Sequence, residues 1–348
     1  MNVYVALSGG VDSAVSAALL RQQGHEVTGV FIRIYRPEFI ECTWREDRLD
    51  AMRVCAALSI PYREVDFSEE YKREVVDAMI VDYRNGITPN PDVLCNRAIK
   101  FGSFFSWAKS QGADKIATGH YARIANSGHR YQLLRGIDSQ KDQSYFLYRL
   151  TESDLEQTAF PVGELEKSEV RTLAKALGLP VAQKHDSQGV CFIGDVSMPD
   201  FLRRYIDIPR GAVHNINGET IGEHEGAAFF TLGQRHGFSI SSSVEGGPQY
   251  VVGIHVETNT ITVSPQRMDA AKEICKVGSL TWVSTPPKNG EVLAAQTRYR
   301  ERAAPVSLEK LEDGRCLVRF VTPHIAPPGQ SLVLYDKNTV VGGGVILK

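Results

Sequence analysis

Near its start the chain reads Val3-Tyr4-Val5-Ala6-Leu7-Ser8-Gly9-Gly10-Val11-Asp12-Ser13. An apolar run, typical of a buried strand, ends in a polar turn with two glycines, and a helix-forming segment follows over residues 14–23. Glycines let the backbone turn tightly and bring bare N–H groups toward a ligand, and the start of the following helix attracts anions. The turn has neither the Gly-Lys-Ser/Thr of a Walker loop nor the spacing of a dinucleotide fingerprint. It predicts a pyrophosphate cradle; the simpler alternative is an ordinary turn capped by Asp12 or Ser13.

Beyond this turn, strands expected over 27–32, 62–67 and 115–118 alternate with helices expected over 47–58, 68–85 and 96–111. Repeated βα units predict an α/β fold with a doubly wound parallel sheet, which binds ligands at the carboxyl ends of its strands. Ser8 and the turn Thr118-Gly119-His120 both lie at such ends. After Tyr121 we expect a hairpin, then a helix over 164–177 and, from about residue 211, short strands in two small β-rich modules that meet near Lys276.

Length and composition narrow the class of protein. With 348 residues, 43% hydrophobic and 23% charged, the chain predicts a globular protein of two or three domains. No apolar stretch reaches the roughly 18–20 residues that span a bilayer, and the phosphate turn leaves no room for a targeting segment. We therefore expect a cytoplasmic protein that does not bind membranes.

Charge is distributed unevenly along the chain. The net charge of −2 argues against electrostatic binding of nucleic acid along the whole length of the chain. Residues 288–348 hold nine Lys/Arg and six Asp/Glu, a balance of +3, which leaves −5 for the rest. A mildly basic end on an acidic body fits a local RNA contact, although an inert domain can show the same balance.

Six cysteines stand at positions 42, 55, 95, 191, 275 and 316. No two of them have the Cys-x-x-Cys spacing of a zinc site, so we predict no metal bound by the protein alone. A disulfide scaffold is not expected in a cytosolic chain of this size. Cys55, Cys275 and Cys316 fall in apolar runs and are interpreted as buried structural thiols, whereas Cys42 is ambiguous.

Two cysteines have polar surroundings that suit chemistry. Cys95 follows Asn90-Pro91-Asp92 and precedes a helix expected to begin at Asn96, where the helix terminus would lower the thiol pKa. Asp92 could transfer a proton there; the alternative is a proline-rich turn capped by Asp92 or Asn96. Cys191 follows a glycine-containing polar turn within residues 186–194 and is expected to be accessible, the alternative being a core thiol.

Two further motifs precede the β-rich region. Gly119 permits close approach of a nucleotide, and His120 beside it is either a ligand contact or an ordinary turn histidine. Lys141-Asp142-Gln143 offers a cation, a carboxylate and an amide to a charged substrate, or is a solvated loop before a helix.

The ordered set of motifs resembles the tRNA-specific 2-thiouridylases, a family of PP-loop ATP pyrophosphatases, along essentially the whole chain. The residues that carry the resemblance are 8–13, 90–96, 118–123, 141–147, 186–194, Thr231-Leu232-Gly233-Gln234-Arg235 and Arg298-Tyr299-Arg300. Related sulfur-inserting enzymes share the phosphate loop but not the Asn-Pro-Asp-x-x-Cys segment. The resemblance implies a PP-loop catalytic domain over 1–198 with a helical insertion near 160–180, a central tRNA-contacting domain over 199–275 and a C-terminal β-barrel over 276–348.

The resemblance also implies the reaction. ATP, with Mg²⁺, adenylates O2 of the wobble uridine of a tRNA, and sulfur then replaces that oxygen at C2, giving 2-thiouridine, AMP and pyrophosphate. Cys191 would carry the sulfur as a persulfide, Cys95 would be the nucleophile that helps to release it, and Asp92 would assist at the target base. The implied partners are the anticodon arm of tRNA and a persulfide-donating sulfur carrier or cysteine desulfurase.

The resemblance assigns residues to three ligands. ATP would be held by Ala6, Leu7, Ser8, Gly9, Gly10, Val11, Asp12, Ser13, Ile32 and Gly119; the target base by Asn90, Pro91 and Asp92; and tRNA by His120, Lys141, Asp142, Gln143, Arg298, Tyr299 and Gln330. The chain departs from the family pattern on the adenosine side. Residues 34–46 lack the expected Asn-Trp and acidic run, and Ile32 stands in place of a methionine.

Two other functions remain as alternatives. One is a nucleotide-binding protein without catalysis, against which the presence of both cysteines and Asp92 argues. The other is a PP-loop amidating ligase acting on a purine or an amino acid, which would need neither two separated cysteines nor an RNA-facing β-rich module. Binding of a tRNA anticodon arm would distinguish these possibilities.

Overall fold

The computed structural model describes residues 1–40, 44–128, 130–185, 196–241, 247–311 and 313–348. Its first part is a five-stranded sheet in the order β3-β2-β1-β4-β7, and every neighbouring pair is parallel. The strands are β1 (Asn2–Leu7), β2 (Glu26–Arg33), β3 (Tyr62–Asp66), β4 (Lys115–Ala117) and β7 (Thr158–Ala159). The predicted doubly wound parallel sheet is confirmed.

Both faces of this sheet are covered, because side chains of the central strand β1 alternate between two cores. Val3, Val5 and Leu7 pack with α1 (Val11–Gln22), α2 (Trp44–Ala57) and α8 (Lys167–Ala176). Tyr4 packs on the other face with two composite helices. The first joins α3 (Ser68–Tyr71), the π-helical η1 (Lys72–Asp77) and α4 (Ala78–Arg84); the second joins α5 (Pro91–Cys95), the π-helical η2 (Asn96–Ser103) and α6 (Phe104–Ser110).

The second composite helix begins five residues before the predicted start at Asn96, so that prediction was wrong. Asn90 is the N-cap, and its side-chain oxygen accepts the backbone N–H of Val93 at 3.3 Å. Pro91 occupies the first helical position, where the missing N–H costs nothing and the ring fixes a helical φ. Cys95 therefore lies more than one turn inside the helix.

The predicted hairpin after Tyr121 is confirmed as β5 (Ala122–Ser127) and β6 (Arg130–Arg135). The chain then passes through η3 (Ser144–Leu147) and α7 (Glu152–Glu156) before α8, which is the predicted helix over 164–177. β6 pairs with the last strand, β18, at Leu134 and Thr339. The hairpin thereby extends the C-terminal sheet.

The C-terminal region is the expected β-barrel. Its six strands follow the order β13-β16-β15-β14-β17-β18, and pairing of β13 with β18 closes the ring. They are β13 (Lys272–Trp282), β14 (Val292–Gln296), β15 (Ala304–Lys310), β16 (Cys316–His324), β17 (Ser331–Asp336) and β18 (Thr339–Ile346).

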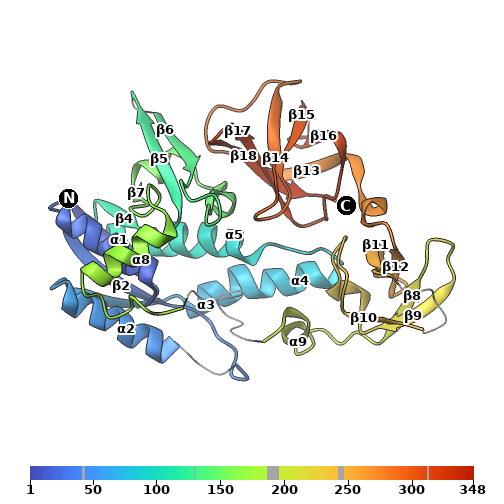
Figure 1. Cartoon of the computed structure of the whole chain (residues 1–348), viewed down its shortest axis with the longest axis horizontal. Helices are drawn as coiled ribbons and strands as arrows, with labels where there is room; N and C mark the ends of the chain where they lie inside the picture. Colours follow the sequence, from blue (N-terminus) through green and yellow to red (C-terminus); the bar gives the residue numbers. More distant parts are fainter. Residues whose placement is uncertain (41–43, 129, 186–195, 242–246, 312) are drawn as a thin grey trace.

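Along the chain, a middle sheet lies between the parallel sheet and the barrel, with its strands in the order β10-β9-β8-β12-β11. Its elements are β8 (Gly211–His214), β9 (Thr220–His224), β10 (Phe238–Ile240), β11 (Tyr250–His255) and β12 (Thr260–Ser264), with α9 (Met198–Leu202), η4 (Ala227–Phe229) and η5 (Arg267–Ala270). The predicted domain boundaries near 198 and 275 fall inside α9 and β13. Figure 1 shows the parallel sheet at the left, the barrel at the upper right and the middle sheet at the lower right, with α4 running toward the middle sheet.

Candidate functional site

The glycine turn after β1 is shaped to receive an anion. Gly9 has φ +75°, and a Cβ there would lie 2.4 Å from the carbonyl oxygen of Asp47 in α2. The N-cap of α1 is Gly10, which has no side chain to accept the first N–H groups of the helix. The alternative of a turn capped by Asp12 or Ser13 was therefore wrong: the Ser13 hydroxyl instead donates back to Gly10 O at 3.1 Å. An uncapped helix start presents its N–H groups to a phosphate.

Asp12 points away from the cap and forms an ion pair. Its two oxygens lie 2.7 and 2.9 Å from Nζ of Lys167, at the start of α8, and one of them accepts the Tyr121 hydroxyl at 2.8 Å. The Lys167 side chain is 13% exposed, against 31% for Asp12. Sequence reasoning missed Lys167, because 155 residues separate it from Asp12 and no motif surrounds it.

The structure brings Gly119 against the same turn. A Cβ at Gly119 would lie 2.7 Å from the backbone N of Ser13, so only glycine fits where β4 passes the start of α1. Ile32 follows Phe31, the β2 partner of Leu7, at the same edge of the sheet. The ATP residues expected over 6–13, at 32 and at 119 therefore share one edge.

Around the predicted base site, Asp92 lies in the first turn of α5 and Cys95 at its end. Burial raises the pKa of the Asp92 carboxyl above its ordinary value, and the positive charge of Lys100 opposes that rise. Cys95 is 5% exposed. Because Cys95 lies inside the helix, the argument that a helix start lowers its thiol pKa does not hold.

His120 is buried between two polar groups rather than exposed. Its Nδ1 lies 2.7 Å from the Thr118 hydroxyl, and its Nε2 lies 3.4 Å from Nζ of Lys100. Burial, and then the Lys100 charge, hold its pKa well below the ordinary value, so the ring is neutral. Since an ammonium only donates, Nε2 is the acceptor and the proton sits on Nδ1. Lys100 was missed because nothing in the sequence distinguishes it from a surface lysine.

Two of the residues expected to contact tRNA use their side chains within the fold. The carboxylate of Asp142 accepts the backbone N–H groups of Gly136 and Ser144, each at 3.1 Å, and pairs with Arg135 at 2.8 Å. The side-chain oxygen of Gln143 accepts the backbone N–H of Tyr121 at 3.0 Å. These contacts fix the loop that also carries Lys141.

The remaining expected tRNA residues lie at the junction of the barrel with its neighbours. Arg298 donates to the carbonyl of Leu232, and burial, with Arg267 nearby, lowers its pKa. Tyr299 packs on Phe146 with ring centroids 4.5 Å apart, and exposed Arg300 lies over the Tyr299 ring at 5.1 Å.

The last of them, Gln330, donates to the carbonyls of Thr88 and Pro89 at 2.8 and 3.1 Å. The barrel therefore touches the loop that leads into the base site.

Three other cysteines have the predicted structural role. Cys55, Cys275 and Cys316 are buried, and burial raises the thiol pKa of Cys55 to about 11 and of Cys275 to about 12. Cys42 and the segment 186–194, with Cys191, lie outside the described residues.

Within the described ranges, no cluster of three or more His, Cys, Asp or Glu could hold a metal ion. No helix in that part of the chain is long and apolar enough to cross a bilayer.

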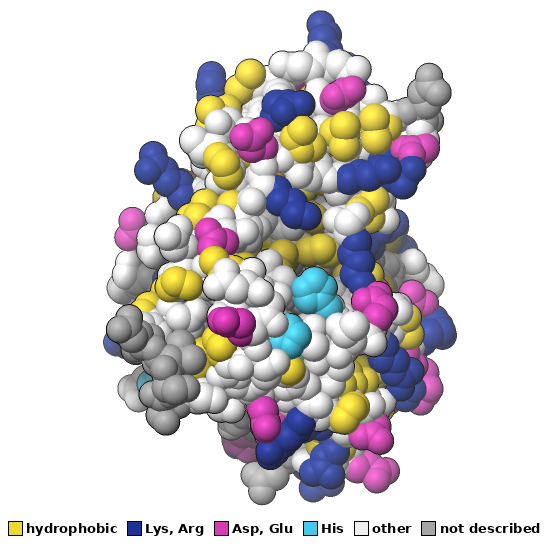
Figure 2. Space-filling model, turned by 90° about the vertical axis from the view of Figure 1, so that its right-hand side faces the viewer, with side chains coloured by type: hydrophobic (Ala, Val, Ile, Leu, Met, Phe, Trp, Pro, Cys, Tyr) yellow, Lys and Arg dark blue, Asp and Glu magenta, His cyan; other side chains and the backbone are white. Residues whose placement is uncertain are grey.

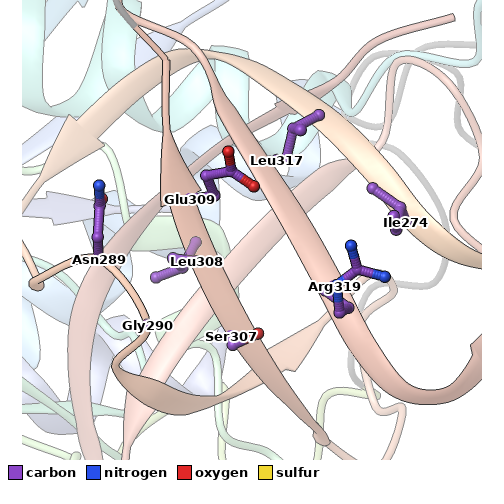
Figure 3. A pocket seen from close by; sticks show the side chains of 8 residues that line it. All are labelled: Ile274, Asn289, Gly290, Ser307, Leu308, Glu309, Leu317 and Arg319. Carbon is purple, nitrogen blue, oxygen red and sulfur yellow. The ribbon is translucent and has the colours of Figure 1, made fainter.

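One hollow of about 270 Å³ lies elsewhere, on the barrel wall. Figure 3 shows it across β15 and β16, with Ile274 of β13, Ser307 and Arg319 among its lining. None of the predicted site residues that the structure describes lines it, so we do not assign it to the reaction.

Comparison with known proteins covers nearly the whole chain. Three family models match: the tRNA methyl transferase HUP domain over 1–195, the tRNA methyl transferase PRC-barrel domain over 199–265 and the aminomethyltransferase β-barrel domain over 272–346. A tRNA-specific 2-thiouridylase MnmA from Nitrosomonas eutropha is 43% identical over 99% of this chain and 98% of its own length. One of the same name from Stenotrophomonas maltophilia is 45% identical over 99% of this chain and 93% of its own length.

The family models thus follow one another in the order of the parallel sheet, the middle sheet and the barrel, and the relatives align with the chain from end to end. A similarity of this extent includes the phosphate turn, the Asn90–Cys95 segment and the barrel that contacts it. This chain belongs to the tRNA-specific 2-thiouridylase family.

Proposed function

We propose that this protein catalyses ATP-dependent 2-thiolation of the wobble uridine of tRNA. The observation that carries the proposal is its membership of the 2-thiouridylase family, together with a phosphate turn and a base-site helix on one scaffold. The reaction has two halves. Uridine O2 attacks the α-phosphorus of ATP and releases pyrophosphate, and sulfur then displaces AMP from C2.

The first half needs a site for the triphosphate. The uncapped start of α1 supplies N–H donors, Gly9 and Gly119 allow close backbone approach, and Lys167 brings a cation to the same place. These groups fit a triphosphate, and preorganised donors of this kind stabilise the charge that develops on the leaving pyrophosphate. We assign Asp12 and the phosphates as ligands for Mg²⁺, which binds proteins through one or two carboxylates plus phosphate oxygens. A bound Mg²⁺ would neutralise charge on the pyrophosphate.

The second half needs two thiols. The terminal sulfur of a persulfide on Cys191 attacks C2 and AMP leaves with the oxygen. The thiolate of Cys95 then attacks the Cys191 sulfur, which breaks the S–S bond and leaves the sulfur on uridine. The two cysteines end as a disulfide, and a cellular thiol must return two electrons to reset them. A persulfide-donating carrier or a cysteine desulfurase must load Cys191 again, and since the substrate is tRNA we place the cycle in the cytoplasm.

The proposal is tested on the whole enzyme. Incubation with unmodified tRNA, ATP, Mg²⁺, a thiol reductant and a persulfide donor (a cysteine desulfurase with cysteine), followed by mass spectrometry of the tRNA nucleosides, should yield 2-thiouridine and an equivalent of pyrophosphate. Omission of ATP should abolish both. ATP-dependent amidation of a purine or amino acid, with no 2-thiouridine, would favour the ligase alternative and overturn the proposal.

We place part of the tRNA interface at Arg300, because it is exposed and stacks with Tyr299, so that it offers a cation beside an aromatic ring. Lysine and arginine do not form one continuous patch on the face in Figure 2, where they alternate with acidic side chains. A tRNA on that face would meet separate cations and no continuous basic surface.

Replacing Arg300 by alanine should weaken tRNA binding and reduce the dependence of log Kd on log salt by about 1, the value for one lost phosphate contact. The double variant with Arg298→Ala should bind more weakly still, since Arg298 also ties the barrel to Leu232. Lys337→Ala is the matched control, because Lys337 is exposed on the same barrel and also has a positive φ, 52° against 62°. Unchanged affinity and salt slope in the double variant would remove this segment from the interface.

A further inference from the structure

The loop that leads into the base site is held by both β-rich modules. Gln330 of the barrel donates to the carbonyls of Thr88 and Pro89, at 2.8 and 3.1 Å, and the backbone N–H of Thr88 donates to Pro328 O at 3.1 Å. From the middle module, the Thr231 hydroxyl lies 3.0 Å from that of Thr88. Thr88 is thus the point at which the parallel-sheet domain, the barrel and the middle module are hydrogen-bonded together.

The barrel and the base-site loop are tightly packed where they meet. Gly329, next to Gln330, has φ +89°, and a Cβ there would lie 2.2 Å from Cγ2 of Ile87 and 2.7 Å from Thr88 O. The barrel backbone therefore rests directly against the loop, and no side chain larger than hydrogen fits between them.

A second contact joins the parallel-sheet domain to the barrel. The buried Tyr145 hydroxyl lies 2.8 Å from Ser331 O and 3.2 Å from Thr297 O, both in the barrel. Tyr145 belongs to η3, which packs against α5 and η2. The helix that carries Asp92 and Cys95 is therefore held at its entry loop by Gln330 and along its side by η3.

Gln330 has little left to offer an RNA as a donor. The amide group of glutamine has two N–H bonds, and two carbonyls of the loop accept from its nitrogen. Asn90, the next residue after Pro89, is the N-cap of α5. A shift at residues 88–89 is passed directly to the start of the helix that carries the site.

We propose that Gln330 is a positioning residue, which sets the place of Asp92 and Cys95 through the carbonyls of Thr88 and Pro89 and does not serve mainly to bind tRNA. The inference rests on the proposed function and adds to it: the barrel takes part in the reaction by fixing the base-site loop. We call the hydrogen bonds that hold Thr88 and Pro89 the brace of the base-site loop. Misplacement of reacting groups by about 1 Å can cost about 100-fold in rate, so loss of the brace should reduce the rate of thiolation by the enzyme–tRNA complex.

The test uses two variants of the full chain. Gln330→Met keeps the length of the side chain and removes its donors, and Gln330→Glu keeps its shape but turns a carboxylate toward two carbonyls. Single-turnover thiolation at saturating tRNA and ATP should fall about 10- to 100-fold in both. The Kd for tRNA should stay close to that of the wild type, as should ATP binding, which also reports that the parallel-sheet domain is folded.

Gln22→Met is the matched control, since Gln22 is an exposed glutamine at the end of α1. It should leave rate and affinity unchanged. A Gln330 variant with a weaker Kd and an undiminished saturated rate would show a direct tRNA contact and overturn the proposal, as would one in which neither value changes. Thr231→Val tests the brace from the middle module and should slow the same step. If the wild type itself forms no 2-thiouridine, the proposed function is wrong. If the wild type does form it, the rates of the Gln330 variants test only the positioning role of Gln330.

Discussion

Replacing Cys95 by serine should abolish formation of 2-thiouridine while pyrophosphate release in the presence of tRNA continues close to the wild-type rate. A serine hydroxyl is not ionised near neutral pH and cannot attack a disulfide sulfur, whereas adenylation needs no thiol. Mass spectrometry of tRNA nucleosides measures thiolation, and a coupled pyrophosphate assay measures adenylation. Cys191→Ser should give the same division, because it removes the sulfur carrier.

Cys275→Ser is the control for the loss of a thiol as such. Its side chain is 7% exposed, close to the 5% of Cys95, but it lies in the barrel strand β13. It should cost some stability and retain thiolation per folded molecule. If Cys95→Ser still transfers sulfur from a persulfide donor, the assignment of Cys95 as the nucleophile is wrong; if a folded Cys191→Ser enzyme loses pyrophosphate release as well, the two halves of the reaction are not separate.

Replacing Asp12 by asparagine should lower ATP-dependent pyrophosphate release about 100- to 1,000-fold, the range found when one group that stabilises transition-state charge is removed. Asparagine keeps the shape and can still accept the Tyr121 hydroxyl, so the change removes mainly the negative charge that pairs with Lys167 and that would hold Mg²⁺ beside the phosphates. Lys167→Met should impair the same step, since it takes a cation from the phosphate turn and leaves the carboxylate without its counter-ion.

Lys72→Met separates this effect from the loss of an ordinary ion pair. Lys72 binds both oxygens of Asp77 at 2.9 and 3.0 Å, much as Lys167 binds Asp12, but its side chain is 40% exposed on η1. Exposed pairs contribute roughly 0–1 kcal/mol to stability, so this variant should retain both its melting temperature and its activity. A large drop in the melting temperature of Asp12→Asn, with activity per folded molecule intact, would make the pair at Asp12 structural.

The fold could be predicted where local signals agree with the tertiary structure. An apolar run, a glycine turn and a helix former in sequence predict β1 and the end of α1 to within one residue, because propensity, turn chemistry and burial all require the same structure; the helix itself begins at Val11, three residues before the predicted start. The start of the next site helix was misplaced at Asn96 although the signal was present. Asn90 followed by Pro91 is the usual pattern of an N-cap and first helical residue, and the second proline two positions earlier made it look like an extended loop.

The site could be predicted only where its residues carry a motif. Gly9, Gly119 and Asn90 occupy backbone positions that require a particular residue type, a glycine at a close approach or a capping residue at a helix start, so the sequence alone indicates them. Lys100 and Lys167 contact His120 and Asp12 through long side chains that reach across the fold. The residues next to each lysine in the sequence therefore do not indicate its partner. Asp142 shows the converse, since its motif suggested a ligand contact but its carboxylate satisfies buried backbone N–H groups.

The brace between Thr88 and Gln330 spans 242 residues of sequence. The entropy of closing so long a loop has to be overcome before such a contact is gained, and the domains of a chain of this size fold as separate units. The parallel sheet should therefore acquire its nucleotide-binding turn early in refolding, whereas the base-site loop becomes fixed only when the barrel docks. Pulse-labelling hydrogen exchange should show protection of the β1 amides before that of Thr88, and ATP affinity should return before thiolation activity.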